Sequence, residues 1–392
     1  MSRLTDAFKN QNIDSLSETT KDSSLPPLPV VDWKSIGNKA PVIIPFPLSI
    51  HDPNAPLPKA DIVVITWTGP EWSAFDHVFC NSGSPRDYYD TTWDSDWMPY
   101  TRNAPPPPPP PATNYNYWGY YRMVEITGQS GKQVKVLLFK SQTHLAHPPY
   151  LPGLIEMTKA ILTETGASYL YSIGTAGGAS EIKDTGLLGN TMITNSGHLQ
   201  MTLSQNKSPL NDQTYTCESW FPGFDLMEPV RQQLLYPLSN VAFGYVYEKL
   251  FLQLKNYIAY HYPTIDMSFI TVDDLVNKPL DPANLHNPQT FNCKDFPLLT
   301  TDYYYIASPG DGDKYCILEM DDSVLGEVAG SMNVNYAFVR NVSDTYVPFT
   351  TKSGKTIPAE VQSEWSSVVY GHFGFYTSYN GALSTWATIA AM

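Results

Sequence analysis

A continuous β-branched run within residues 60–66, Ala-Asp-Ile-Val-Val-Ile-Thr, constrains the fold more than any other feature of the sequence. Successive β-branched residues without polar alternation are typical of a strand that is buried on both faces. A helix is predicted from Glu71 onward. Further strands are expected at 168–173, 189–194, 267–272, 315–320 and 336–342, and helices at 152–165 and 323–332. Strands that alternate with helices predict an α/β layered fold with a largely parallel or mixed central sheet.

Other segments interrupt this alternation. Strands near 121–127 and 133–140 flank Gly-Gln-Ser-Gly-Lys, which predicts a hairpin. Residues 1–58 form a Pro-rich N-terminal arm, and residues 80–121 and 200–265 are predicted insertions. The first insertion holds seven consecutive prolines, 105–111, among many aromatic residues. This run is a polyproline II segment that either docks on its own aromatic neighbours or serves as an SH3 or WW ligand.

Charge and cysteine content exclude several classes of function. Lys and Arg number 24 against 38 Asp and Glu, a net charge of −14, which argues against a nucleic-acid partner because such binding needs a basic surface. The four cysteines form no CxxC pair, so we expect free thiols in a reducing compartment and no structural zinc. The N-terminus has no apolar signal segment, and no apolar run approaches the roughly 20 residues of a membrane helix. A cytoplasmic location without membrane association is expected.

Four ordered segments carry a resemblance to a known family. The most legible is Ser172-Ile-Gly-Thr-Ala-Gly-Gly178 directly after an apolar strand, followed by the Gly-containing stretch 183–193. The others are Ile-Thr-Trp-Thr-Gly-Pro-Glu at 65–71, Ile-Thr-Val-Asp-Asp-Leu-Val-Asn at 270–277, and the pair Leu-Glu-Met-Asp-Asp at 318–322 with Phe-Val-Arg-Asn-Val-Ser-Asp at 338–344. Together they resemble the motifs of the purine nucleoside phosphorylase and methylthioadenosine/S-adenosylhomocysteine nucleosidase superfamily.

The resemblance implies a three-layer α/β/α sandwich with a mixed central sheet, phosphorylase/hydrolase-like, over residues 59–392. It also implies a small-molecule nucleoside or nucleotide as substrate, no metal or organic cofactor, and a homodimer or higher homo-oligomer. An adenine base is favoured.

The resemblance assigns catalytic roles to two carboxylates. Breaking a purine–ribose bond needs an acid for the leaving base and a base that activates the nucleophile. Asp344 is the expected acid at N7 of the purine, and burial would have to raise its pKa. Glu71 is the expected base that activates water. The alternatives are ordinary structural roles, a helix N-cap for Asp344 and a first-turn glutamate that complements the helix dipole for Glu71.

The remaining predicted site residues bind substrate. Thr175 offers a hydroxyl for the water, and the backbone of Ala176 and Gly177 approaches the ligand closely. Asp321 stands where the family carries a glutamate that grips the ribose hydroxyls, so Asp322 or Glu319 could share that contact. Met320 is predicted to contact the ribose face, and Leu275 and Val276 are predicted to contact the base. Ser343 is predicted to lie beside the acid. For Met320, a place in the core is the alternative.

The choice of nucleophile depends on arginine. Phosphorylases of this superfamily typically carry one two residues before the Gly-Ser/Thr turn, and here that position is Ser172. The first loop offers Glu71, whose charge would repel phosphate. Hydrolysis is therefore favoured over phosphorolysis. A member that binds a nucleoside without catalysis is the alternative from a different class, suggested by Asp321 and the insertions.

Other polar residues carry weaker signals. His144 and His147 are an i, i+3 pair without an evident third metal ligand, and we expect them to shape the loop near the sugar 5′ end. Arg340 is expected to pair with a carboxylate inside the fold. Two interpretations are left for four basic residues: they contact a 5′ phosphate, or they are ordinary surface charges. These residues are Arg86, Arg102, Lys140 and His198.

Overall fold

The computed structural model describes most of the chain. The described residues are 28–37, 40–46, 52–81, 96–105, 118–146, 148–178, 187–235, 240–275, 288–302, 314–345 and 347–392. Val276, Arg86, His147 and prolines 106–111 lie outside them, and so do most of the predicted insertion at 80–121 and most of the N-terminal arm.

One mixed sheet forms the centre of the molecule. Its main path runs β1-β4-β5-β2-β6-β12-β11-β8-β9, while β13 pairs with β6 and β7, β10 with β7, and β3 with β4. The pairs β2–β5, β2–β6 and β6–β13 are parallel, and β4–β5 is the predicted antiparallel hairpin. The strands are β1 (Val42–Ile43), β2 (Ile62–Thr66), β3 (Met98–Tyr100), β4 (Gly119–Thr127), β5 (Gln133–Ser141), β6 (Tyr169–Gly178), β7 (Thr191–Thr194), β8 (Ser196–Gln200), β9 (Gln213–Thr216), β10 (Thr290–Asn292), β11 (Leu298–Thr301), β12 (Ile317–Glu319) and β13 (Asn335–Thr345).

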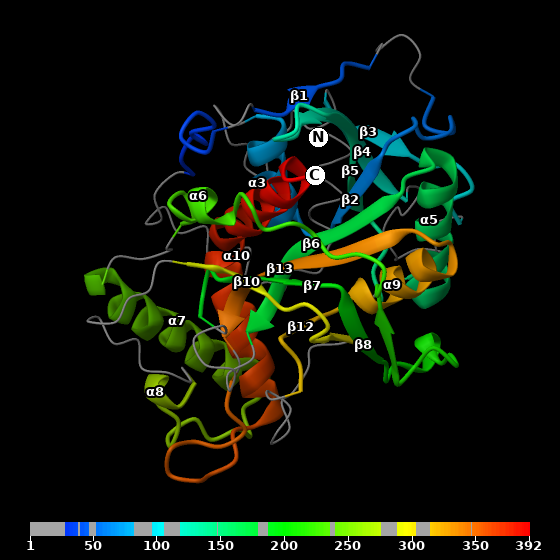
Figure 1. Ribbon diagram of the computed structural model, residues 1–392. Helices are drawn as coiled ribbons and strands as arrows, with labels where there is room; N and C mark the ends of the chain where they lie inside the picture. The colour runs from blue at the N-terminus through cyan, green and yellow to red at the C-terminus, as the bar shows by residue number, and fades with distance from the viewer. Residues whose placement is uncertain are drawn as a thin grey trace.

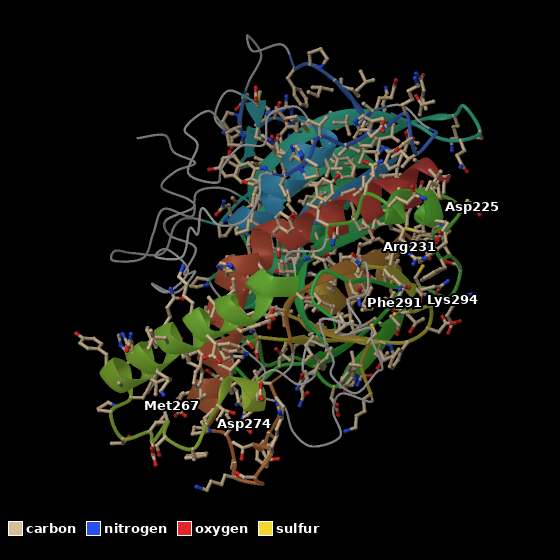
Figure 2. All side chains as sticks on the ribbon, turned by 90° about the vertical axis from the view of Figure 1, so that its left-hand side faces the viewer. Asp225, Arg231, Met267, Asp274, Phe291 and Lys294 are labelled. Atoms are coloured by element: carbon tan, nitrogen blue, oxygen red, sulfur yellow. The ribbon has the colours of Figure 1, made fainter. Side chains whose placement is uncertain are left out.

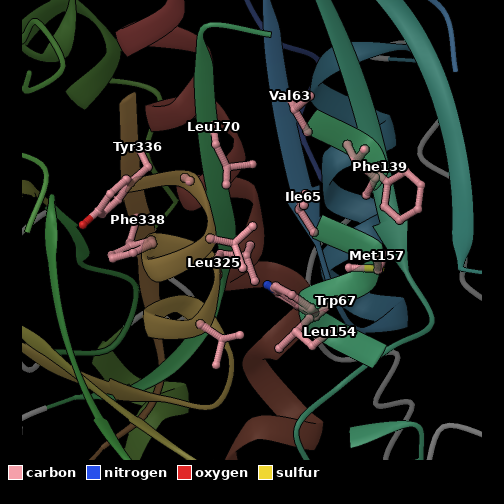
Figure 3. Packing of buried hydrophobic residues seen from close by; sticks show 14 of the residues in the cluster. Val63, Ile65, Trp67, Phe139, Leu154, Met157, Leu170, Leu325, Tyr336 and Phe338 are labelled. Atoms are coloured by element: carbon pink, nitrogen blue, oxygen red, sulfur yellow. The ribbon is translucent and has the colours of Figure 1, made fainter. Parts of the chain in front are cut away.

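Helices cover both faces of this sheet (Figure 1). They are α3 (Gly69–Phe79), α5 (Tyr150–Thr165), the 3-10 turn η3 (Ser204–Asn206), α6 (Met227–Arg231), α7 (Asn240–His261), α8 (Val272–Leu275), α9 (Asp322–Ser331) and α10 (Ala359–Ala390). Strand β2 shows the layering: alternate residues Ile62 and Val64 pack in a core with α3 and α10, while Val63 and Ile65 pack in a second core with α5 and α9. Figure 3 shows part of the second core, where Leu154 and Leu325 approach the sheet from these two helices. The predicted α/β/α class is confirmed.

Helix α10, coloured red in Figure 1, is the longest element and runs along the sheet beside α3. It spans 32 residues, and nearly all of its side chains from Tyr376 to Ala390 are buried. Several of these are small and polar, and they bond to neighbouring strands or loops: Asn341 of β13 donates to Thr377, and Asn380 donates to the carbonyls of Gly189 and Leu235. The sequence predicted no helix here.

A third apolar cluster lies beyond the sheet, between α7, α8 and the first half of α10. In Figure 2, Met267 and Asp274 lie together at this end of the molecule, away from Asp225 and Arg231 near α6. The predicted strand at 267–272 is wrong, because this segment is a turn that leads into α8. Asp274 accepts hydrogen bonds from the backbone and hydroxyl of Thr271, and such local bonds favour a turn over a strand.

Two further expectations concern the chain as a whole. All four cysteines are free, as predicted, and three of them are buried. Within the described residues no helix has the length and apolar character that crossing a membrane requires.

Candidate active site

The first turn of α3 places Glu71 against strand β6. Glu71 is buried, and its Oε2 accepts hydrogen bonds from the backbone N–H groups of Thr68 (2.9 Å) and Trp67 (3.1 Å). Its Oε1 accepts from the backbone N–H of Thr175 at 2.8 Å and from the Thr175 hydroxyl. One carboxylate oxygen therefore has the structural role of closing the helix start, and the other faces β6. The structural role of Glu71 in the first turn and its predicted role as a catalytic base are therefore compatible.

A β-bulge in β13 sets the position of Asp344. The pairing of β13 with β6 shifts register between Val342 and Asp344, so that Ser343 has no partner in the ladder. Such bulges re-aim the following side chain. Asp344 is still within the strand, and the next helix, α10, begins only at Ala359, so the helix N-cap alternative is wrong.

The Asp344 carboxyl group has the environment of an acid. The residue is only partly exposed, and burial raises the pKa of this carboxyl to about 6, although hydrogen bonds from the hydroxyls of Ser343 and Ser366 lower it. The Ser343 hydroxyl donates to Oδ1 at 2.8 Å and also lies 3.4 Å from the carbonyl of Ala176. Near pH 6 this group exists in both protonation states and so can donate a proton.

Strand β6 brings Glu71 and Asp344 to the same site. Glu71 meets Thr175, and Asp344 Oδ2 lies 3.4 Å from the point where a Cβ on Gly177 would stand. Residues two apart on a strand lie on one face, about 7 Å apart. Thr175 and Gly177 are both partly exposed here, while Ala176 between them is buried. The predicted base and the predicted acid therefore approach β6 two residues apart, Glu71 at Thr175 and Asp344 at Gly177.

The side chain of Arg340 in β13 bonds to residues of β6, β12 and α9. Its Nε donates to Asp322 Oδ2 at 2.8 Å, and its Nη2 pairs with Asp322 Oδ1 and with Glu319 Oε2, the latter at 3.1 Å. The same guanidinium donates to the carbonyl of Thr175 and the hydroxyl of Ser172, both at 3.2 Å. The side chain is buried, and the predicted pairing with an internal carboxylate is confirmed.

The carboxyl groups around Arg340 outnumber its single positive charge. Burial, together with the charge of Asp322, raises the pKa of Glu319 to about 7. Burial and then the charge of Glu319 raise the pKa of Asp321 well above its usual range. Asp322 holds Arg340 through both of its carboxylate oxygens, which makes a bidentate pair.

Asp321 is bound to the loop that follows β5. Its Oδ1 accepts the N–H of Leu145 at 3.0 Å, and its Oδ2 lies 3.1 Å from His144 Nε2. The backbone N–H of Ala146 donates to His144 Nδ1, so the proton of a neutral ring is on Nε2 and points to Asp321. Asp321 is 2% exposed, so contact with a ribose needs this loop to move or His144 to take part.

The four other predicted site residues differ in how they are placed. Glu319 is buried under Arg340, accepts the N–H of Asp321 at 2.7 Å, and so supports the loop rather than facing outward. Met320 is partly exposed beside it. Leu275 is fully buried in the third cluster with Val347 and Trp365, which neighbour the segments that carry Asp344 and Ser366. Val276 lies outside the described residues.

The basic residues considered for a phosphate have other partners. Lys140 is fully buried and donates to the carbonyl of Ser141 at 2.6 Å, so neither of its sequence-based interpretations holds. Arg102 pairs with Glu164 at the surface, and His198 lies against Asp212 and Tyr315 at the far end of the sheet. Arg86 and His147 lie outside the described residues, and across the described part of the chain no group of three His, Cys, Asp or Glu is arranged to hold a metal ion.

Ser366 is the site residue that the sequence did not predict. Its hydroxyl hydrogen-bonds the Asp344 carboxylate from α10. A second link from the same helix is the hydroxyl of Tyr370, which donates to Thr68 at the start of α3 at 2.8 Å. Neither contact could be expected from the sequence, because no helix was predicted at 359–390.

The known proteins that are similar to this chain are solved structures with low sequence identity. No protein-family model and no curated protein sequence matches the chain. It is similar to the crystal structure of 5′-methylthioadenosine/S-adenosylhomocysteine nucleosidase from Neisseria meningitidis in complex with methylthio-immucillin-A, at 10% identity over 84% of this chain and 99% of that one, with a TM-score of 0.43.

Two further solved structures give similar values. Futalosine hydrolase of Helicobacter pylori matches at 10% identity over 84% of this chain and 97% of that chain, with a TM-score of 0.43. A putative 5′-methylthioadenosine/S-adenosylhomocysteine nucleosidase from Borrelia burgdorferi bound to adenine matches at 11% identity over 84% and 100%, with a TM-score of 0.44. At such values the fold class rests on the sheet and helices described above, and the function rests on the geometry of the site.

Proposed function

We propose that this protein hydrolyses the N-glycosidic bond of a purine nucleoside or nucleotide, with adenine as the favoured base. The observation that carries the proposal is the placement of Glu71 at Thr175 and of Asp344 at Gly177, two residues apart on β6. Two carboxyl groups in different environments are what such a cleavage needs, since one must donate a proton and the other must accept one.

Asp344 is proposed as the acid. With a pKa of about 6 it is protonated in part of the population near neutral pH, and its proton can go to N7 of the leaving purine. The base then departs as a neutral molecule, and the C–N bonding electrons stay with it. Ser343 and Ser366 hold the carboxyl group in place during this transfer.

Glu71 is proposed as the base. Its Oε1 already faces the hydroxyl and N–H of Thr175, so a water bound beside Thr175 would lie within reach of the carboxylate. The water loses a proton to Glu71, and its oxygen forms the new bond to the anomeric carbon. Thr175 positions this water.

Water is favoured over phosphate by the charges around the site. Arg340, whose guanidinium lies against the carbonyl of Thr175, is neutralised by Asp322 and Glu319. Lys140 is fully buried and directed to the carbonyl of Ser141. An anion beside Glu71 would lack a bidentate partner from either residue.

The proposal is tested by incubating the purified protein with adenosine, methylthioadenosine, S-adenosylhomocysteine, AMP and ATP, with and without phosphate. Free adenine and a free sugar that form without phosphate are the expected products. Strict dependence on phosphate would make the protein a phosphorylase. Shifts in melting temperature without any free base would make it a binding protein, and the proposal would then be wrong.

A further inference from the structure

The buried amine of Lys140 is next to the site and has no role in the chemistry above. Lys140 and Arg340 are the two Lys or Arg residues among the buried ones that the structure describes, and Arg340 is saturated by Asp322 and Glu319. Burying an ammonium group is costly unless a negative partner accompanies it. The position of Lys140 therefore needs an explanation.

The sheet register places Lys140 on the same side as Glu71. Lys140 of β5 is paired with Thr66 of β2, and Thr66 lies in phase with Ile62 and Val64, which pack toward α3. The Thr66 hydroxyl lies 3.5 Å from Glu71 Oε2. Lys140 thus faces the first turn of α3 from the strand beside β2.

Aromatic rings form the other walls around Lys140. Tyr120 of β4 is its register partner on the second side, and Trp72, the residue after Glu71, stacks on Tyr120 with ring centroids 5.5 Å apart. Burial lowers the pKa of Lys140 to about 7, and the charge of Glu71 opposes that shift. Its amine donates to the carbonyl of Ser141, which is a neutral acceptor.

Two other cations near Glu71 or α3 are held by carboxylates. Arg122 of β4 pairs with Asp76 of α3 at 3.3 Å. Arg340 of β13 acts on Glu71 as well, but it is held by Asp322 and Glu319. Of these three cations, Lys140 is the one that has no carboxylate partner within the described part of the chain.

We propose that Lys140 is a positioning residue whose ammonium group attracts the carboxylate of Glu71 and holds it in place, so that Glu71 accepts the proton of the attacking water. This inference rests on the proposed function, since it assigns Glu71 the role of base. The attraction between an ammonium group and a carboxylate is strong where water is excluded.

The first test compares kcat/KM of the wild type and Lys140→Met between pH 5 and pH 9. Methionine keeps much of the length and removes the charge. The wild type is expected to exceed the variant by about tenfold at pH 5, where the amine of Lys140 is charged. The ratio should fall toward one at pH 9, where the amine of Lys140 is neutral in the wild type too.

Lys135→Met is the matched control, because Lys135 lies on the same strand with an exposed side chain. Its ratio to the wild type should stay near one at every pH. A Lys140→Met ratio that is the same at all pH values would mean that Lys140 only fills space, and the inference would be overturned.

The second test depends neither on turnover nor on the methionine variant. In protein labelled with carbon-13 at lysine, the side-chain signal of Lys140 is titrated in the wild type and in Glu71→Gln. The midpoint is expected to fall in Glu71→Gln, since the charge that favours the ammonium form is lost. An unchanged midpoint would refute the coupling. A lack of activity in the wild type, with a shifted midpoint, would count against the proposed function instead.

Discussion

Glu71 Oε1 accepts hydrogen bonds from both the backbone N–H and the hydroxyl of Thr175, a residue 104 positions later in the chain. This contact joins the start of α3 to β6, the strand that Asp344 of β13 also approaches. Each partner of Glu71 is a donor, so the site is built around an acceptor at this position. The expected behaviour of several variants follows from this arrangement.

Asp344→Asn is expected to lower kcat by at least about a hundredfold, because an amide cannot donate the proton that the leaving base needs. The measurement is release of free base at saturating nucleoside. Asp273→Asn, at an exposed residue of α8, is the control and should keep full activity. Unchanged turnover in Asp344→Asn would reject the acid assignment.

Ser366→Ala is expected to move the alkaline limb of the pH profile upward. Asp344 must be protonated to act, so activity should fall as the pH rises above about 6 in the wild type. The Ser366 hydroxyl lowers the pKa of Asp344, so its removal leaves that pKa higher and the acid form persists to higher pH. The profile of kcat/KM between pH 4 and pH 9 reports this limb. Ser363→Ala on the same helix should leave it in place, and a downward move in Ser366→Ala would contradict the assignment.

Glu71→Gln is expected to destabilise the fold as well as to abolish turnover. The NH₂ of a glutamine would face N–H donors, of Thr68 and Trp67 on one side or of Thr175 on the other. One unsatisfied buried contact costs about 1–3 kcal/mol, so the melting temperature should fall. Glu360→Gln, an exposed residue in the first turn of α10, is the control for loss of a first-turn charge. Equal melting temperatures for both variants would show that the bonds of Glu71 add no stability.

Lys140→Met is expected to change how stability depends on pH. The pKa of Lys140 is about 7 in the folded protein against 10.5 as its ordinary value, so between these values the unfolded chain binds one more proton. Stability contributed by this group therefore rises as pH increases from 7 to 10.5, and it is lowest below pH 7. The melting temperature of the wild type minus that of Lys140→Met should increase over this window. A constant difference would show that Lys140 titrates normally.

The sequence was sufficient for the central part of the fold. The β-branched run within 60–66 predicted a strand buried on both faces, and β2 is fully buried. The helix from Glu71, the hairpin of β4 and β5, and the strands that became β6 and β13 were also predicted correctly. These elements have a strong apolar pattern or clear turn residues, and such local patterns predict secondary structure well.

Helix α10 was missed for a physical reason. Its buried half carries Thr, Ser, Asn and Gly among its apolar residues, so it has no one-sided apolar stripe to recognise. The polar groups are satisfied by bonds to other elements or to the helix itself, such as Ser378 to the carbonyl of Gly374. Only tertiary structure shows that this composition can be buried.

The candidate site was predictable in its residues but not in their connections. Motifs pointed to Glu71, Thr175 and Asp344, and the structure gathers these three around β6. Their roles stay predictions. The bond of Asp321 to His144 could not be foreseen, because the two residues are 177 positions apart and meet through a loop.

The support that α10 gives to Asp344 has a consequence for biosynthesis. Ser366 reaches the acid from a segment that leaves the ribosome after every strand of the sheet has been made. A nascent chain with its sheet complete but this helix still in the exit tunnel lacks one of the hydroxyls that hold the carboxyl group. The Asp344 carboxyl group thus reaches its final environment only once α10 has been made and has packed against the sheet.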